Sequence, residues 1–227
     1  EPAPAPRPEG AAAVQGVTVT ANGVRLTVVP DPSVATAVAE GPHEVWQDGD
    51  RLHLELPGRA ATYAARRRWQ FGNVRIDWPF GSGERVRLRV NPAVDLRLEL
   101  VGCDAKFRGT RGPLQVGCFS GALTVTDHDG PLSGTVTTGS ARIEAVLRGA
   151  QDTISCDMGS LQLTLLPGSD TRIVGYADMG AVKIAGTDVT SGPDPRTGLS
   201  TASHAVVGAG TGNLMIGVRM GSAKVMT

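Results

Sequence analysis

Apolar and polar residues alternate with a period of two along most of this chain. A clear case is Val86-Arg87-Leu88-Arg89-Val90, and the same pattern returns in Leu96-Arg97-Leu98-Glu99-Leu100. Successive side chains of a β-strand point to opposite faces of its sheet, so this pattern predicts strands that bury one face. Many short strands, and an all-β fold, are expected.

Two hairpins are expected in the first sixty residues. Asn22-Gly23 lies between the alternating residues 17–20 and 24–29, and Asn-Gly in that position is typical of a hairpin turn. A second hairpin joins residues 44–46 to residues 51–56 and leaves His53 facing solvent. Together they predict a hairpin-rich cap at the N-terminal side of the fold.

A unit of about 20 residues repeats from Arg85 onward. Each copy is a short alternating strand, a bend ending in glycine plus a small residue, and a second alternating strand. Aligning the copies on this position gives one column: Cys103, Gly121, Gly139, Gly159, Gly180 and Gly221. The steps from Gly121 onward are 18, 20, 21 and 41 residues, and we interpret the last as two repeats that contain an excursion loop at 186–202. One unit cannot bury its own apolar face, so the copies are expected to stack as a β-solenoid or β-roll.

The aligned columns separate core from surface. Residues two and four positions after the column glycine are apolar, whereas those three positions after it are polar and include no carboxylate: Lys106, Thr124, Arg142, Gln162, Lys183 and Lys224. Met158, Met179 and Met220 precede the glycine in three copies, and we interpret them as gap-filling core residues rather than soft-metal ligands. Asp157 and Asp178 are expected to stack in neighbouring repeats as solvated turn residues.

The three cysteines predict neither a disulfide framework nor a metal site. Cys118 and Cys156 occupy one apolar column, two repeats apart, or ~9–10 Å at ordinary strand spacing. A disulfide needs a shorter Cα separation, so we interpret both as small core residues. A Cys103–Cys118 bridge stays open as an alternative to free thiols, and no metal or cofactor is expected.

Composition and charge narrow the choice of class. The chain of 227 residues has 30 glycines, 15 prolines and 4% aromatics, so it is rich in turns. Its 22 basic residues balance 22 acidic ones, which argues against a globally basic nucleic-acid binder. No apolar run is long enough to span a membrane. Residues 1–14 are proline-rich and predict a linker or stalk, residues 15–84 the cap and residues 85–227 the repeat region, cap and repeats forming one continuous domain.

Charge is nevertheless uneven. Residues 59–89 contain eight arginines against Asp77 and Glu84, a surplus of six positive charges. Arginines among aromatic side chains can stack on sugars or bind anionic polymers. The candidate ligand-binding residues are Arg66, Arg67, Arg68, Trp69 and Trp78. The alternative is that the aromatics plug an open end of the core while the arginines are solvated.

The chain resembles the bacterial "putative adhesin" family of β-strand-repeat domains of unknown function. The resemblance rests on residues 48–54, on residues 84–92 and on the glycine-centred repeats, and it covers roughly residues 15–227. This chain has Gly-Ser or Gly-Ala where that family commonly has Gly-Asp. The resemblance implies a β-roll or β-solenoid on the cell surface, with no catalytic residues.

These observations predict a non-catalytic exported module with a structural or adhesive role. The polar column lacks the paired carboxylates that glycoside hydrolysis needs, so an enzyme is not expected. An extracellular, cell-surface or periplasmic location is expected, with an export signal or anchor removed before Glu1. Partners would be a second copy, through an open solenoid end after Val225, or an extracellular polymer.

Overall fold

The structure is a computed structural model that describes residues 14–57, 70–71, 74–75, 84–149, 151–185, 190–193 and 201–227. All regular structure in these residues is β-strand, which confirms the all-β prediction. The strands form one large mixed sheet and a separate antiparallel pair, β6 (Gln70–Phe71) with β7 (Val74–Arg75). In the described part of the chain no helix is long and apolar enough to cross a membrane.

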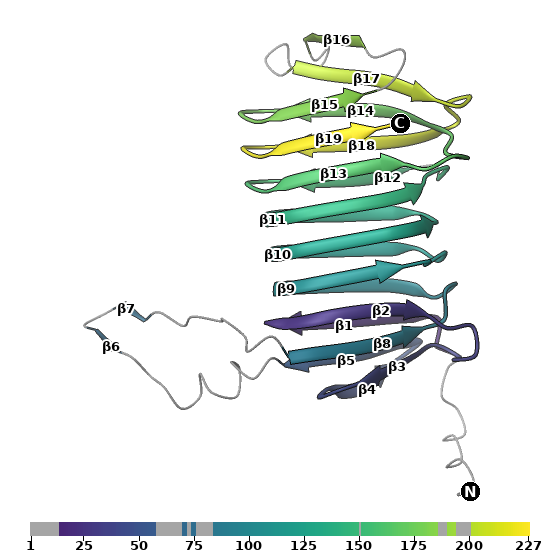
Figure 1. Cartoon of the computed structure of the whole chain (residues 1–227), viewed down its shortest axis with the longest axis vertical. Coiled ribbons are helices and arrows are strands. Elements are labelled where there is room, and N and C mark those ends of the chain that lie inside the picture. The colour runs from purple at the N-terminus through teal and green to yellow at the C-terminus, as the bar shows by residue number, and fades with distance from the viewer. Residues whose placement is uncertain are drawn as a thin grey trace, which may run out of the picture.

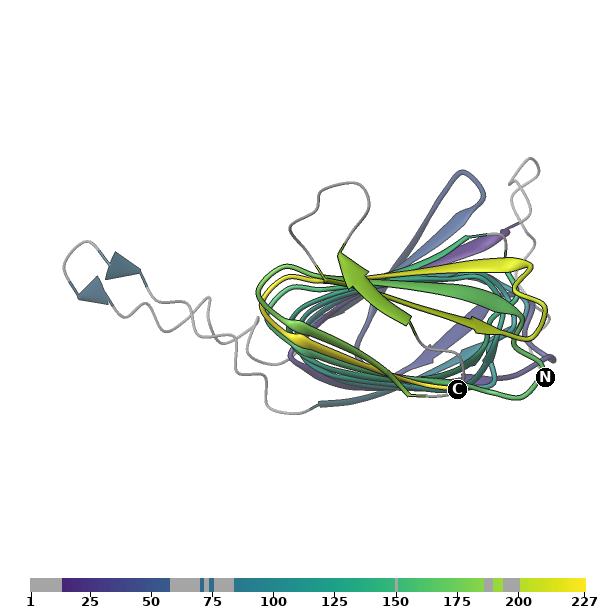
Figure 2. The ribbon, with the colours of Figure 1, turned by 90° about the horizontal axis from the view of Figure 1, so that it is seen from above.

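The large sheet bends into a stack of tiers, and each tier places strands on two opposing faces (Figures 1 and 2). Within a tier, the strand that comes earlier in the chain lies on what we call the first face, and the strand that follows lies on the second face. Three long strands each cross from the first face to the second: β9 (Asp95–Arg108), β10 (Leu114–Asp129) and β11 (Leu132–Val146). The other tiers have a first-face and a second-face strand each: β5 (Arg51–Pro57) with β8 (Glu84–Val90), β1 (Gly16–Asn22) with β2 (Val24–Pro30), β12 (Asp152–Cys156) with β13 (Ser160–Leu165), β18 (Gly212–Val218) with β19 (Ser222–Met226), and β14 (Thr171–Ala177) with β15 (Ala181–Ala185).

Neighbouring tiers pair in parallel, in the register that the glycine alignment predicts. Gly121 lies opposite Cys103 on one side and Gly139 on the other. A side chain at position 121 would overlap the carbonyl oxygen of Cys103. The φ angle of Gly121, 111°, also disfavours any residue other than glycine. Gly139, Gly159 and Gly221 meet a neighbouring carbonyl in the same way. From Gly121 onward the column therefore consists of glycine, because adjacent backbones touch at this corner.

The order of tiers in space differs from their order in the chain at both ends. The tier β18/β19 lies between β12/β13 and β14/β15, and the tier β1/β2 lies between β5/β8 and β9. The expected hairpin at Asn22-Gly23 is therefore wrong, because β1 and β2 lie on different faces and pair with other tiers. The expected open edge after Val225 is also wrong, because β19 pairs with β13 and β15 along both edges. The second expected hairpin is confirmed by the antiparallel pairing of β4 (Glu44–Asp48) with β5.

Antiparallel strands line the two ends of the stack. At one end β4 (Glu44–Asp48) pairs with β5 and β3 (Ala37–Glu40) pairs with β8. At the other end β17 (Thr201–Val207) pairs with β14, and β16 (Thr190–Pro193) pairs with β17. These short strands cover edges of the full tiers that could otherwise pair with another chain.

Polar clasps hold both inserted tiers in place. The Arg51 guanidinium reaches across Gly16, at the start of β1, to the Asp95 carboxylate at 2.7 Å. In the turn before β18, the amide of Gly210 donates to Asp170 Oδ1 at 2.6 Å and the Thr211 hydroxyl donates to Oδ2 at 2.7 Å. These hydrogen bonds lower the pKa of Asp170, with the Thr211 side chain as the main cause.

The core lies between the two faces and is apolar along its length. Inward residues such as Leu98, Leu163 and Ile216 are fully buried. Cys103, Cys118 and Cys156 are free thiols in this core, and burial raises the pKa of each. The structure thus has free thiols rather than a Cys103–Cys118 bridge.

The methionines at the corner contradict their interpretation as core. Met158, Met179 and Met220 are exposed, with relative accessibilities of 52%, 77% and 49%. They precede the column glycine at the corner where the chain leaves the first face, so no opposing tier covers them. Because β18/β19 is inserted, Met220 lies between Met158 and Met179. Arg219 likewise separates Asp157 from Asp178, which corrects the expectation that these two carboxylates stack in neighbouring tiers.

Candidate functional site: a polar ladder on the second face

A line of outward side chains crosses the second face at right angles to its strands. Each member lies opposite the next in the strand pairing, and we call the set the ladder: Arg87, Thr27, Lys106, Thr124, Arg142, Gln162, Lys224 and Lys183. The predicted polar column supplies six of these residues, and the N-terminal tiers supply Thr27 and Arg87. Seven strand spacings of about 4.8 Å give the ladder a length of about 34 Å.

The cations of the ladder make no ion pair within the described residues, although Glu40 of β3 lies opposite Arg87 in the strand pairing. Described ion pairs involve Arg25, Arg51, Arg89, Arg97, Arg108 and Arg148, and none of these belongs to the ladder. Within the ladder, the Arg142 guanidinium donates a hydrogen bond to Gln162 Oε1 at 3.2 Å. Arg87, Lys106, Arg142, Lys183 and Lys224 are all exposed. Their charges are therefore available to an anionic ligand.

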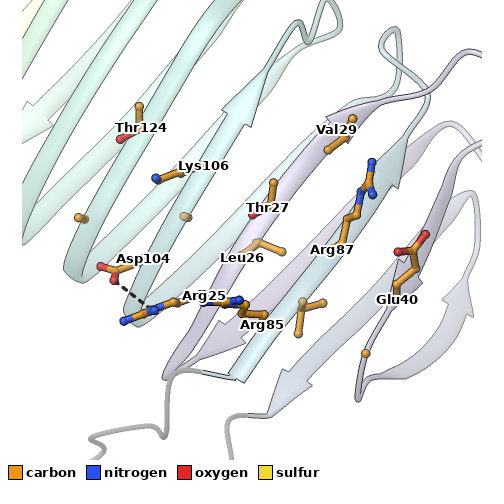
Figure 3. Close-up of a pocket in the computed structure, with 14 residues that line it drawn as sticks. Arg25, Leu26, Thr27, Val29, Glu40, Arg85, Arg87, Asp104, Lys106 and Thr124 are labelled. Atoms are coloured by element: carbon orange, nitrogen blue, oxygen red, sulfur yellow. Dashed lines mark ion pairs between the residues drawn. The ribbon is translucent and has the colours of Figure 1, made fainter.

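Two hollows adjoin along the ladder and share Ala122 and Thr124 in their lining. The larger, about 1060 Å³, lies over β2, β8 and β9 (Figure 3). There Thr124, Lys106, Thr27 and Arg87 follow one another across four strands. The second hollow, about 470 Å³, continues over β10, β11, β13 and β19.

The two acidic residues of the larger hollow are both engaged by arginines. Asp104 lies 3.9 Å from Arg25, and Glu40 lies 3.7 Å from Arg89. Arg85 lies opposite Arg25 and adds a further cation to the same wall. The lining therefore has more basic than acidic side chains, although the net charge of the whole chain is zero.

A row of small residues runs beside the ladder, one step closer to the glycine corner. We call it the trough: Ala122, Ser140, Ser160, Ser222 and Ala181. Because these side chains are short, the surface falls away between the ladder and the corner, and four of the five line the second hollow. The exposed Met158, Met220 and Met179 border the trough on its corner side, over three adjacent tiers.

The first face differs in chemistry. Its central row contains Thr18, Gln115, Ser133 and Thr153, and its one arginine in that stretch, Arg97, is paired with Glu99 at 3.4 Å. At the end of this face the Trp46 and His53 rings stack with centroids 5.4 Å apart. His53 is thus partly covered rather than fully solvated. From β1 to β12 the central row of the first face has hydroxyl and amide groups and no unpaired charge, so the candidate site lies on the second face.

A polar cluster inside the stack contributes to folding rather than to a site. His128 is fully buried, with Nδ1 2.9 Å from the Thr110 hydroxyl and Nε2 3.3 Å from the Pro131 carbonyl oxygen. Burial lowers the pKa of His128 and raises that of Asp152, whose Oδ1 accepts the Leu132 amide at 2.7 Å. The cluster does not reach either face. Among the described residues, no group of three or more His, Cys, Asp or Glu side chains could hold a metal ion.

The five residues singled out in the sequence lie outside the described part of the chain. Arg66, Arg67, Arg68, Trp69 and Trp78 belong to the segment that joins β5 to β8. The described end of the same basic segment is β8, whose Arg85 and Arg87 line the larger hollow. Alternation in the repeats predicted most of the ladder, but the sequence did not indicate that Thr27 and Arg87 extend it.

No protein-family model matches the chain, and no curated protein matches it. Among solved structures, one described as a "putative cell adhesion protein" from Clostridium sporogenes is similar, with a TM-score of 0.48 and 9% identity over 94% of this chain and 93% of that one.

Proposed function

We propose that the chain is a non-catalytic, exported surface module, a β-solenoid of about 20-residue turns that adheres to an anionic glycan through the ladder. One observation carries the proposal: five exposed cations in a single line across the second face have no ion pair among the described residues. The parallel register holds these cations on a rigid sheet, so a bound polymer would contact several at once. The same proposal includes that the chain is an adhesin-like domain of the bacterial type and that it acts outside the cell.

Lining chemistry favours binding over catalysis. Asp104 and Glu40, the carboxylates of the larger hollow, lie within ion-pair distance of Arg25 and Arg89. Glu40 also lies opposite Arg87, at the end of the ladder, and no carboxylate lies between Arg87 and Lys183 along it. Many contacts along one line suit adhesion, because weak contacts made by one polymer add together. Hydroxyl and amide groups between the cations can bind neutral parts of a glycan.

Retention on immobilised heparin tests this proposal. The wild-type chain should bind at low salt and elute as the salt concentration rises, because exposed ionic contacts are screened. The double variant Lys106→Gln/Arg142→Gln should elute at clearly lower salt. Its matched control, Arg111→Gln/Arg172→Gln, removes two exposed cations that lie off the ladder and should elute with the wild type. Equal elution of both doubles would overturn the proposal.

The arginine and tryptophan segment is a second candidate for the same class of ligand. It joins β5 to β8, and β8 lines the larger hollow. Replacing Arg66, Arg67 and Arg68 with serine tests it, and unchanged retention would exclude a role for them. Self-association stays a separate prediction, and light scattering over a range of concentrations tests it.

A further inference from the structure

Charged and neutral residues alternate along most of the ladder. From one end the order is Arg87, Thr27, Lys106, Thr124, Arg142, Gln162 and Lys224, with Lys183 beyond. A cation therefore stands on every second strand from β8 to β19. Neighbouring strands are about 4.8 Å apart, so the cations recur roughly every 9.6 Å. A neutral hydrogen-bonding side chain lies between each pair.

This alternation exists in space and not in the sequence. In chain order the same positions begin with Thr27 and then give two cations in succession, Arg87 and Lys106. Inserting the tier β1/β2 between β8 and β9 separates those two cations by a threonine. The spacing is therefore a property of the assembled second face.

The surroundings of the ladder suit a sugar chain. Ser140, Ser160 and Ser222 put hydroxyls in the trough, beside the cations. Met158 and Met220 form an exposed apolar border on the other side. A pyranose chain has acidic groups, hydroxyls and apolar C–H faces, and this surface provides a complement for each.

We infer that the ladder selects extended acidic polysaccharides that have one anionic group per disaccharide. The inference rests on the proposed function and adds the class of glycan. In such a polymer, successive acid groups are separated by two sugar rings, which is roughly the distance between cations on alternate strands. Polymers with denser charge, such as heparin or polyphosphate, would place some anions opposite Thr27, Thr124 or Gln162, where no cation meets them.

Binding of the full chain to three polymers at one ionic strength tests the inference. Hyaluronan has one carboxylate per disaccharide, whereas heparin and polyphosphate are much denser in charge. By fluorescence polarisation of labelled oligomers matched in total charge, hyaluronan should bind most tightly. Lys106→Gln/Arg142→Gln should weaken hyaluronan binding by about tenfold or more, because two of the spaced contacts are lost.

A variant that conserves charge separates spacing from net charge. Lys106→Gln/Thr124→Lys moves one cation by a single strand, next to Arg142, and leaves the number of cations unchanged. It should weaken hyaluronan binding by about tenfold while heparin binding stays near the wild-type value. Circular dichroism of the variants confirms that each remains folded.

The outcomes distinguish this inference from the proposed function. If affinity follows charge density and the variant with the moved lysine binds hyaluronan like the wild type, the spacing inference is overturned while glycan binding through the ladder stands. If no polymer binds, or if Lys106→Gln/Arg142→Gln binds all three like the wild type, both are overturned. Weaker hyaluronan binding by the moved-lysine variant, with heparin binding kept, supports both.

Discussion

Gly221 packs directly against the backbone carbonyl of Gly159, although a complete tier and the strands β16 and β17 separate them in the chain. Gly180, which precedes Gly221 in the chain, lies on its far side. This contact fixes the C-terminal tier at the spacing of its neighbours. The strands β18 and β19 therefore fill the space between the tiers β12/β13 and β14/β15.

Replacing Gly221 with alanine tests how closely the β18/β19 tier packs against its neighbour at this contact. The new Cβ would overlap the Gly159 carbonyl oxygen, and backbone cannot yield as easily as a flexible side chain. We expect Gly221→Ala to lower the free energy of unfolding by about 1–3 kcal/mol, measured by urea denaturation. Gly217→Ala in the same tier is the matched control, because no atom lies within 4 Å of its Cβ position. It should be neutral or slightly stabilising, and an equal loss in both variants would contradict this account.

Repeat alignment predicted which residues share a column, but not the order in which tiers stack. Alternation is a local property of each strand, so Lys183 and Lys224 could be placed in one outward column from sequence alone. Which tier neighbours which depends on pairing between distant segments. The step of 41 residues between Gly180 and Gly221 predicts two repeats that contain an excursion loop, whereas the chain turns back through β17 and then enters the stack next to β14.

The same distinction explains the other errors. Asn22-Gly23 is a good turn sequence, and Gly23 does have a positive φ of 65°, but the turn joins two faces rather than two paired strands. Met158, Met179 and Met220 lie at a corner, where alternation no longer says which side is buried. Local chemistry therefore predicted turns and strand faces, and long-range pairing decided what surrounds them.

Asp170 should make the C-terminal tier sensitive to acid. Hydrogen bonds from Thr211 and Gly210 lower its pKa in the folded state below its unfolded value. A carboxyl group of this kind stabilises the fold fully above its unfolded pKa of about 3.9 and loses that contribution as pH falls through the folded pKa.

We therefore expect Asp170→Asn to be less stable than the wild type at pH 7, with the difference shrinking below about pH 4. Urea denaturation at several pH values measures it. Asp178→Asn is the control, since Asp178 lies at the other end of the same strand and its side chain makes no hydrogen bond among the described residues. A difference between Asp170→Asn and the wild type that stays constant to pH 3 would count against the clasp.

His128 should destabilise the fold when it becomes protonated. Burial lowers its folded pKa below the unfolded value of about 6.5, so the unfolded chain binds a proton first as the pH falls. Stability then decreases as pH drops through that value. Asp152 opposes this trend, since its charge favours the protonated imidazole.

His128→Asn should remove this dependence, because asparagine keeps a polar group near the Thr110 hydroxyl but does not titrate. Between pH 7.5 and 5.5 the wild type should lose stability more steeply than the variant, as followed by thermal unfolding. His53→Asn is the matched control, because it replaces a histidine outside the buried cluster. If His128→Asn retains the wild-type slope, the buried imidazole is not its source.

The three cysteines should be unreactive until the tiers separate. Cys103, Cys118 and Cys156 are all buried, and desolvation raises the pKa of each thiol, so the reactive thiolate is scarce at neutral pH. A thiol-specific chromogenic reagent should therefore react slowly with the native chain and with three thiols in denaturant. Titrating only one thiol in denaturant without reductant would instead reveal a bridge.

Because Cys156 Sγ lies next to Gly221, Gly221→Ala should also make Cys156 react faster than Cys103, and mass spectrometry of the modified peptides would identify the residue.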